Sequence, residues 1–484
     1  MPPGKKIEYK WIALGVTTVG TLMAAIDSTI VVLALPDMMV KLHAELIVMV
    51  WVIMAYILIS TVFLLAFGRV ADMLGRARMY NLGFVIFTVG SALCGIAGGA
   101  IQLILFRLVQ GAGGAMMLVN GSAIITEAFP ARQRGRALGI NSIAWAAGGV
   151  AGPLLGGLIL SAADWRWIFY INVPIGIAGS VWGYRVLREL SPPARNERFD
   201  AGGATAFSVG LLALLVALTR GIEAGWTSLP ILSLFALFVV MLVLFLARER
   251  RIEFPVLDLG LFRSRVYNFA VLASMLQSLA IFSVNFLIIF YLQGVRGYSP
   301  LTAALMLIPL PLVSSVVGPL SGLLSDRIGA RVPATIGLLV QAAALVLFIA
   351  QLSPDSSYAV IACGLALMGL GGGLFWSPNT SAAMGSAPVA RLGIASATLA
   401  TLRQTGMVTS FALALAVAAG TLPKEVAMQL FVGTNIALGS APMQAFIIGM
   451  KSAFSVSVGL CLVAALMSLA RGKDEGRHGA AQAS

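Results

Sequence analysis

Charged residues are scarce in this sequence. Asp, Glu, Lys and Arg make up 11% of its 484 residues, whereas soluble globular proteins contain about 25%. Hydrophobic residues reach 59%, and 52 Gly and 20 Pro residues are spread through the apolar runs. This composition excludes a soluble core but suits transmembrane helices, in which Gly permits close packing and neighbouring groups replace the hydrogen bonds that Pro removes. The chain is predicted to be an all-α integral membrane protein.

Residues that hold metals or catalyse reactions are also scarce. The chain has two His and three Cys residues, and Cys94, Cys363 and Cys461 lie in apolar runs without metal-ligand spacing. There is no G-x-x-x-x-G-K-[S/T] segment, and glycine-rich runs such as 111–114 and 369–373 fall within expected helices, where close packing explains them. We therefore expect no metal, no cofactor and no use of ATP, so that energy must come from an ion gradient.

Long apolar segments follow one another along the whole chain. With about 20 residues per span, about fourteen segments are long enough to cross a bilayer. These expected spans are 11–35, 46–68, 79–99, 101–126, 137–161, 167–187, 201–220, 229–247, 268–292, 301–324, 332–351, 358–381, 391–419 and 444–470. Lys and Arg gather in alternate loops, which predicts that both termini are cytoplasmic in a cell inner or plasma membrane. The net charge of +13 is then a topology signal and not a sign of nucleic-acid binding.

Two parts of the sequence resemble each other. Residues 68–75 (GRVADMLG) recur as 322–329 (GLLSDRIG), and residues 138–142 (LGINS) recur as 392–396 (LGIAS). Matching blocks in the same order indicate an internal repeat. The predicted organisation is a six-helix first half (1–190), two inserted helices with their linkers (191–266), a six-helix second half (267–470) and a polar cytoplasmic tail (471–484).

One carboxylate, Asp27, lies deep inside an expected span. A charge there costs roughly 3 kcal/mol or more on insertion scales, and intramembrane acids are usually functional. Arg107 lies at a similar depth in the fourth span, so the two side chains can pair. We interpret Asp27 as the proton-binding group and Arg107 as the residue that sets its proton affinity, because a nearby cation favours the ionised form and burial the protonated form. The alternative is a fixed structural ion pair.

Small residues recur in the fifth expected span. Gly148, Gly152 and Gly156 are four residues apart and share one helical face, which permits close contact with a neighbouring helix. Pro153 removes one backbone donor, and Gly157 follows the third glycine. Packing with a kink is the simplest reading of this pattern.

A short charged loop follows the second span. It contains Asp72, Gly75 and Arg76, and the repeat places Asp326 at the corresponding position of the second half. Charged loop residues can contact the ends of neighbouring helices. Because repeated halves rock against each other in transporters, we interpret this loop as a gating latch on the cytoplasmic side. A merely solvated loop is the alternative.

Polar and aromatic residues near the middle of the spans are candidates for contact with an amphipathic ligand. The candidates for a substrate cavity are Asn120, Trp145, Asn285, Tyr291, Trp376 and Asn379. Lys451 lies near the start of the last span, where it either snorkels towards the interface or faces a cavity and favours anionic or neutral cargo. We favour snorkelling for this residue.

The motifs together resemble those of a known transporter family. Asp27 in the first span, the 68–76 loop, Arg107-x-x-Gln110-Gly111 and the 148–157 glycine pattern occur in the order typical of the major facilitator superfamily. The fifth-span pattern resembles the motif of its drug:proton antiporters, and residues 165–176 (WRWIFYINVPIG) with the fourteen spans resemble the EmrB/QacA-type subfamily. The resemblance covers residues 11 to about 470. Departures are Val31 and Val32, where an Asn is usual, and Met73 and Ala77 in the loop.

The resemblance implies a secondary active multidrug efflux transporter rather than an enzyme. Such a protein exchanges protons for small amphipathic compounds by alternating access, and the fifth-span contact seals a leak on the cytoplasmic side. We expect it to act as a monomer in the lipid bilayer. A lipid or hydrophobic-metabolite exporter of the same fold is the main alternative. A membrane-embedded enzyme, such as a lipid transferase, would need clustered acids or histidines, which the sequence lacks.

Overall fold

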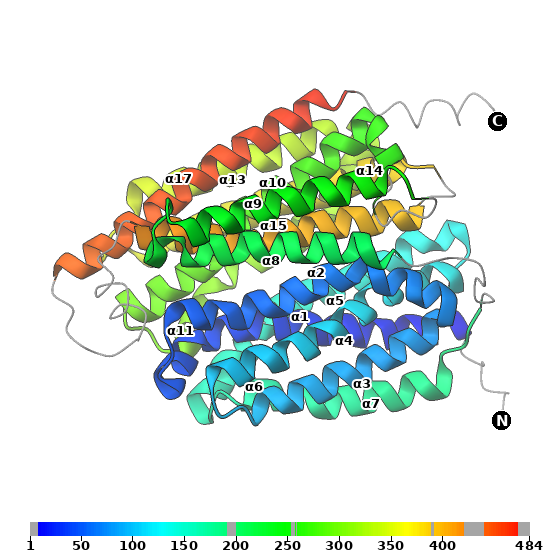
Figure 1. Cartoon of the computed structure of the whole chain (residues 1–484), viewed down its shortest axis with the longest axis horizontal. Coiled ribbons are helices and arrows are strands. Elements are labelled where there is room, and N and C mark those ends of the chain that lie inside the picture. The colour runs from blue at the N-terminus through cyan, green and yellow to red at the C-terminus, as the bar shows by residue number, and fades with distance from the viewer. Residues whose placement is uncertain are drawn as a thin grey trace.

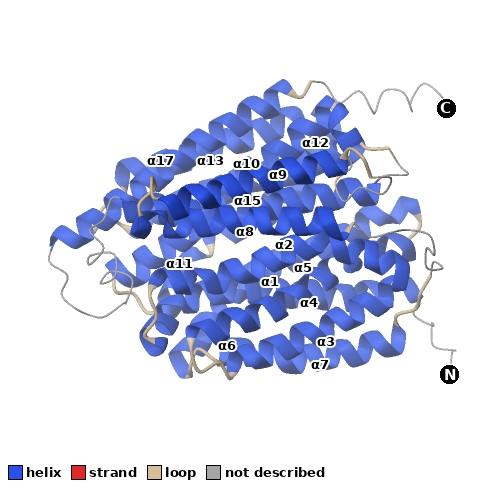
Figure 2. Ribbon diagram, viewed as in Figure 1, coloured by secondary structure: helices blue, strands red, loops and turns tan. Residues whose placement is uncertain are grey.

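The structure is a computed structural model that describes residues 8–190, 200–252, 257, 259–388, 392–420 and 440–472. In these ranges all regular secondary structure is helical, and the long helices run side by side in one bundle (Figure 1). Figure 2 shows that loops occur mainly at the two ends of this bundle. The predicted linker at 191–199 and most of the predicted tail lie outside the described residues.

The first half of the chain contains seven helical segments, two of them close together before the predicted linker. They are α1 (Tyr9–Leu42), α2 (Leu46–Leu74), α3 (Arg76–Gly95), α4 (Ala100–Ala128), α5 (Ala131–Ala162), α6 (Trp167–Tyr170) and α7 (Asn172–Val186). The first helix continues past the expected end at residue 35 and holds Pro36 in its interior. The expected sixth span is divided into the short α6 and the longer α7.

Two inserted helices precede the second half. They are α8 (Ala201–Ala224) and α9 (Leu229–Glu249), followed by η1 (Leu259–Arg263). The second half then contains α10 (Arg265–Phe290), η2 (Tyr291–Val295), α11 (Pro300–Leu307), α12 (Pro309–Ile328), α13 (Arg331–Gln351), α14 (Tyr358–Gly385), α15 (Leu392–Gly420) and α17 (Ser440–Ala470). The expected span 301–324 is therefore two helices, with a break at Ile308 before Pro309.

Two glycines in the repeated loop sequence have the same structural role. Gly75 ends α2 with a φ of 107°, and Gly329 ends α12 with a φ of 82°. The amide of each donates to the carbonyl four residues earlier, to Ala71 at 2.8 Å and to Ser325 at 2.9 Å. Residues with a side chain rarely adopt a positive φ, so this turn requires glycine in both halves.

The loops with most of the arginines share one end of the bundle. The start of α1 and the end of α17 also lie there (Figure 1). Contacts tie several of these segments together: the hydroxyl of Tyr9 donates to the carbonyl of Arg188 at 3.1 Å, and Arg248 pairs with Asp200 at 2.6 Å. We call this end the basic side, and the sequence predicts that it faces the cytoplasm.

The two halves share one large hydrophobic core only on the side away from the basic loops. In the second half, the buried residues of this core fall in 280–295, 303–307, 342–352, 361–368, 408–414 and 446–461. Most of these residues lie in the parts of their helices remote from the basic side, and the segment in α17 extends past the middle of that helix to Cys461. Closer to that side, second-half residues such as Tyr267, Leu338 and Phe375 form two separate clusters, in which no described first-half residue takes part.

Two specific contacts between the halves lie on the same remote side. The amide of Gln293 in η2 donates to the carbonyl of Leu33 in α1 at 3.2 Å. A Cβ atom on Gly157 of α5 would lie 2.7 Å from the Cα atom of Leu301 in α11, so the two helices touch there without a side chain between them. The halves are thus closed together away from the basic side and separate towards it, an inward-facing arrangement if the basic side is cytoplasmic.

The structure supports a many-span membrane protein. Among the described residues, eleven helices are long and apolar enough to cross a membrane, and Val48–Leu64 is a shorter apolar helix. This supports an all-helical membrane fold with about eleven to fourteen candidate spans, where about fourteen were expected. The count of fourteen itself stays a prediction, as does the division of the chain into two repeated halves.

Replacing Gly157 with Leu is expected to open the side of the bundle away from the basic loops. The new side chain would collide with the backbone of Leu301, which cannot move unless α5 and α11 separate. The measurement is labelling of a Gln293→Cys reporter in whole cells by a membrane-impermeant maleimide, with the parent protein as the blank. Labelling should rise several-fold in the Gly157→Leu background.

The matched control for this prediction is Gly149→Leu, because a Cβ at Gly149 has no neighbour within 4 Å. It should leave the labelling of the reporter unchanged. Equal labelling in the Gly157→Leu and Gly149→Leu proteins would show that the α5–α11 contact does not hold the halves together.

Candidate functional site

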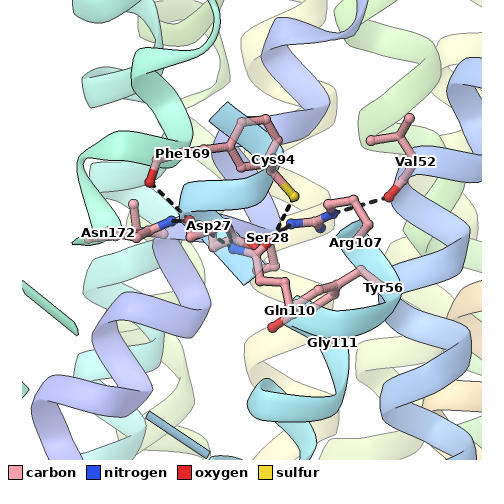
Figure 3. Close-up of polar contacts among 12 residues, drawn as sticks. Asp27, Ser28, Val52, Tyr56, Cys94, Arg107, Gln110, Gly111, Phe169 and Asn172 are labelled. Atoms are coloured by element: carbon pink, nitrogen blue, oxygen red, sulfur yellow. Dashed lines mark hydrogen bonds and ion pairs between the residues drawn. The ribbon is translucent and has the colours of Figure 1, made fainter. Parts of the chain in front are cut away.

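Asp27 and Arg107 form a buried ion pair. Their side chains are 0% and 1% exposed, and Nη1 of Arg107 lies 2.7 Å from Oδ2 of Asp27 (Figure 3). The acid comes from the middle of α1 and the arginine from the first part of α4. The depth argument from sequence therefore placed the two residues correctly beside each other.

The carboxylate of Asp27 accepts two further hydrogen bonds from amide side chains. Nε2 of Gln110 donates to Oδ1 at 2.8 Å, and Nδ2 of Asn172 donates to the same atom at 3.0 Å. Both amides also donate to Oγ of Ser91, each at 3.1 Å. An ionised carboxylate only accepts hydrogen bonds, so this set of donors matches the charged form of Asp27.

Ser91 connects this network to the backbone. Its hydroxyl donates to the carbonyl of Phe169 in α6 at 2.9 Å. The site thus draws on α1, α3, α4, α6 and the first residue of α7 (Figure 3). One buried polar cluster joins nearly all helices of the first half.

The guanidinium of Arg107 is held from other directions as well. Nε donates to the carbonyl of Val52 in α2 at 3.2 Å, and Nη1 also lies 2.7 Å from Oε1 of Gln110. The aromatic ring of Tyr56 lies 4.2 Å from its central carbon, a distance suited to a cation–π contact. Arg107 therefore adds α2 to the set of helices that the cluster joins.

One polar atom in this cluster has no partner. Oδ1 of Asn172 is buried and accepts no hydrogen bond from the described residues. It belongs to the same side chain whose Nδ2 donates to Asp27. A protonated carboxyl group is a donor as well as an acceptor. The cluster thus holds a spare acceptor next to the acid.

The glycine pattern of α5 lies against α1 on both sides of Asp27. A Cβ atom on Gly148 would lie 3.1 Å from the carbonyl oxygen of Leu22, and one on Gly152 would lie 3.0 Å from that of Ile26. Gly156 approaches Ile30 one turn further along. The missing side chains therefore let α5 lie directly on the stretch of α1 that bears the acid.

The same helix reaches the second half through its next glycine. Pro153 lies inside α5, and Gly157 contacts α11. The family resemblance implied a seal on the cytoplasmic side. That seal stays a prediction. In this structure Gly157, near the far end of α5, contacts α11 on the side away from the basic loops.

The charged loop after α2 makes its described contacts within the first half. Nη1 of Arg76 lies 2.7 Å from Oε1 of Glu127 at the end of α4. The carboxylate of Glu189 accepts from the amides of Ala77 and Arg78 at 3.3 and 2.9 Å and so caps the start of α3. A side chain on Gly75 would collide with this carboxylate. The side chains of Asp72 and Asp326 lie outside the described part of the structure, so the latch between halves stays a prediction.

Three of the six predicted cavity residues have their polar atoms bound to backbone. Asn120 donates to the carbonyl of Met116 at 2.8 Å, Tyr291 to that of Ser353 at 2.8 Å, and Asn379 to that of Ala270 at 2.9 Å. All three residues are buried. The bonds of Tyr291 and Asn379 join different segments of the second half, whereas the bond of Asn120 stays within α4, and in this arrangement each of these donors already has a partner.

The other candidates are more accessible. Trp145 and Asn285 are exposed, and Trp376 is partly buried. The guanidinium carbon of Arg403 lies 5.3 Å from the ring centre of Trp376. Lys451 is partly buried in α17.

Sequence reasoning missed several residues of these sites. Gln110 and Asn172 stood within the quoted motifs but received no role, and Ser91 carried no signal of its own. Arg403 is a basic residue twelve positions after the start of the expected span 391–419, at a depth where charge is rare. That depth alone was enough to single it out.

Comparison with known proteins identifies relatives over most of the chain. The family model "Major Facilitator Superfamily" matches residues 17–411. "Multidrug resistance protein Stp" of Mycobacterium tuberculosis is 36% identical over 402 residues, which cover 83% of this chain and 74% of that protein. "Riboflavin transporter RibZ" of Clostridioides difficile is 33% identical over 82% of this chain and 86% of its own length. "Multidrug transporter protein MdtP" of Bacillus subtilis is 32% identical, with 83% and 74% covered.

Solved structures show the same fold at low sequence identity. A bacterial homologue of the human lysosomal transporter Spinster superposes with a TM-score of 0.69 at 17% identity, covering 96% of this chain and 97% of that one. A D-xylose–proton symporter gives a TM-score of 0.68 at 14% identity, covering 97% and 100%. At this level of identity the likeness concerns the fold alone.

Replacing Asn172 with Ala is expected to destabilise the first half. The change removes a donor to the buried carboxylate of Asp27, and loss of one partner of a buried charged group costs about 1–3 kcal/mol. The matched control is Asn120→Ala, which removes an equally buried amide whose bond stays within its own helix turn. The measurement is thermal unfolding of both purified proteins in detergent. A fall in Tm no larger for Asn172→Ala than for Asn120→Ala would show that Asn172 contributes nothing to the cluster.

Proposed function

This chain belongs to the major facilitator superfamily, and we propose on that premise that it is a multidrug exporter that exchanges protons for amphipathic compounds. Several relatives at 31–36% identity are named as multidrug resistance or multidrug transporter proteins. Membership of this family makes the chain a membrane transporter of small molecules. Proton exchange, the fourteen-span EmrB/QacA-type assignment, a monomeric state and location in the cell inner membrane with cytoplasmic termini are part of the proposal.

The observation that carries the proposal is the buried Asp27–Arg107 pair with a spare acceptor beside it. In the structure the donors around Asp27 match its charged form. When Asp27 takes up a proton, the attraction to Arg107 falls, and the new O–H group needs an acceptor. Oδ1 of Asn172 is available for that role. The cluster can thus accommodate both states of the acid.

A change at Asp27 reaches the contact between the halves through two packed helices. The acid lies on α1, α5 is packed on α1 through Gly148, Gly152 and Gly156, and Gly157 of α5 touches α11. Because these glycines let α5 approach α1 so closely that only α1 side chains such as Thr29 and Ile30 lie between them, a movement of one helix would move the other. We propose that protonation shifts α1 and α5 together and releases the closure at Leu301. The side away from the basic loops then opens to release cargo.

The charged loop after α2 would act in the other conformation of the transport cycle, in which the basic side is closed. In the inward-facing arrangement Arg76 pairs with Glu127 within its own half. We propose that Asp72, Gly75, Arg76 and Asp326 form contacts between the halves when the basic side closes. Repeated halves that rock about a central site are the general mechanism of such transporters.

A second candidate function is export of a natural hydrophobic metabolite. The relative in Clostridioides difficile is named a riboflavin transporter and is 33% identical over 82% of this chain. A lipid-like cargo belongs to the same alternative. Both alternatives keep the coupling site and change only the cargo.

Replacing Asp27 with Asn is expected to abolish export driven by a proton gradient. The amide cannot take up a proton, whereas exchange of labelled for unlabelled substrate across a membrane without a gradient needs no proton step and should continue. The measurement is dye transport in everted vesicles, with a panel of anionic, neutral, monocationic and dicationic dyes. Asp200→Asn is the matched control, because Asp200 also pairs with an arginine but in the inserted helices.

The result for Asp200→Asn should equal that for the wild type in both assays. Full gradient-driven export by the Asp27→Asn protein would instead make the pair a fixed structural bridge. If the Asp27→Asn and Asp200→Asn proteins both lose gradient-driven export and substrate exchange, the data give no special role to Asp27.

A further inference from the structure

Arg403 on α15 is a second intramembrane arginine, and it is held differently from Arg107. It lies eleven residues after Leu392, or about 17 Å along the helix. Trp376 lies nine residues before the end of α14 at Gly385, about 14 Å from it. Both are therefore near the middle of a hydrocarbon core of about 30 Å. α14 and α15 both begin or end at the basic side, so the two residues share a depth.

The guanidinium of Arg403 has no acid partner among the described residues. Its Nε is buried and makes no hydrogen bond there, while the side chain as a whole remains partly exposed. Its charged group lies against the ring of Trp376, with 5.3 Å between the guanidinium carbon and the ring centre. By contrast, Arg107 has a carboxylate at 2.7 Å. Among the described residues, then, no acid neutralises this positive charge of the second half.

The surroundings of Arg403 make it accessible from one side. Trp376 is also only partly buried, and it packs against the second-half cluster of Ala273, Leu338 and Phe375. This cluster lies on the part of the second half that is separate from the first half. The pair therefore lies where the bundle opens towards the basic side.

We propose that Arg403 and Trp376 form the cargo site and that it selects planar aromatic compounds with a carboxylate or a similar anionic group. A guanidinium binds a carboxylate through two parallel hydrogen bonds, and its terminal nitrogens are the atoms left for this purpose. An indole ring offers a flat apolar face for stacking. The anion of the cargo supplies the charge that Asp27 supplies for Arg107 in the first half. This inference rests on the proposed export function, and it narrows the substrate class.

A binding assay without a gradient tests the site separately from proton coupling. The full chain is placed in lipid nanodiscs, and the probes are 1-pyrenebutyrate and its neutral amide, which share the aromatic group and differ in charge. The wild type should bind the carboxylate more tightly than the amide. Arg403→Gln should weaken binding of the carboxylate roughly tenfold or more, because a charged hydrogen bond is lost. The affinity of Arg403→Gln for the neutral amide should stay within about twofold of the wild-type value, because the amide loses no charged hydrogen bond.

Two further variants separate the roles of charge and stacking. Trp376→Ala should weaken both probes, because both stack on the ring. The control is Arg296→Gln, since Arg296 also lies against an aromatic ring, that of Tyr298, but donates to the carbonyl of Pro354 at 2.7 Å. It should change neither affinity. If Arg403→Gln does not fold, Arg403→Lys keeps the charge without the two-pronged geometry and should reduce the preference for the carboxylate.

The outcomes divide cleanly. Equal affinity of the wild type for the two probes overturns the proposal, as does an equal loss of both affinities in Arg403→Gln, which would indicate a packing role. An unchanged preference in both Arg403→Gln and Arg403→Lys overturns it too. These results do not depend on Asp27. Failure of proton-driven export in the dye assay with the expected binding here would leave the cargo site standing and refute the proton exchange.

Discussion

The pairing of Asp27 with Arg107 is the interaction on which the first half of this protein depends. Two charges at 0% and 1% exposure are far from water, and removing one partner of such a pair typically costs 3–5 kcal/mol. The protein meets the cost with hydrogen bonds to other segments. Gln110 and Asn172 donate to the acid, Ser91 accepts from both of these amides, and the carbonyl of Val52 accepts from the arginine. The positions of α1, α2, α3, α4 and α7 are therefore tied to the charge state of one carboxylate.

Close packing carries that dependence to the second half. The glycines of α5 bring its backbone within contact of α1, and Gly157 brings it within contact of α11. Helices that touch backbone to backbone have no flexible side chains to absorb a movement. In the proposed mechanism, a change of charge at Asp27 and a change of closure at Leu301 are linked through these contacts. The spare acceptor on Asn172 makes the protonated state of the acid tolerable and so gives the connection two stable positions.

An anionic cargo at Arg403, as proposed, would give the transport cycle an electrical direction. A proton that enters and an organic anion that leaves both move positive charge inward. Each elementary charge is worth about 2.3 kcal/mol per 100 mV of membrane potential. Exchange of a proton for an anion is thus favoured by an interior-negative membrane, whereas exchange for a monocation gains nothing from the potential. The absence of an acid beside Arg403 among the described residues fits the first of these cases.

The sequence predicted those features of the fold and the site that depend on composition and helix length, but not those that depend on which helices face each other. Composition and segment length predicted the membrane class, and a rise of 1.5 Å per residue brought Asp27 and Arg107 to one depth. Hydrophobic runs do not show which helix faces which, so the roles of Ser91 and Asn172 could not be predicted. The same limit explains why Asn120, Tyr291 and Asn379 were taken as cavity residues, although each bonds to a backbone carbonyl. The break at Ile308 was hidden because both flanking segments are apolar.

The relation between Asp27 and the transported proton is tested most directly by proton release. Purified protein in weakly buffered detergent solution is mixed with a transported dye, and the pH change is followed with an indicator. The account predicts that the wild type releases protons in proportion to the dye bound, and that the Asp27→Asn protein binds the dye without releasing any. Equal proton release by the Asp27→Asn protein would contradict the assignment of Asp27 as the proton-binding group.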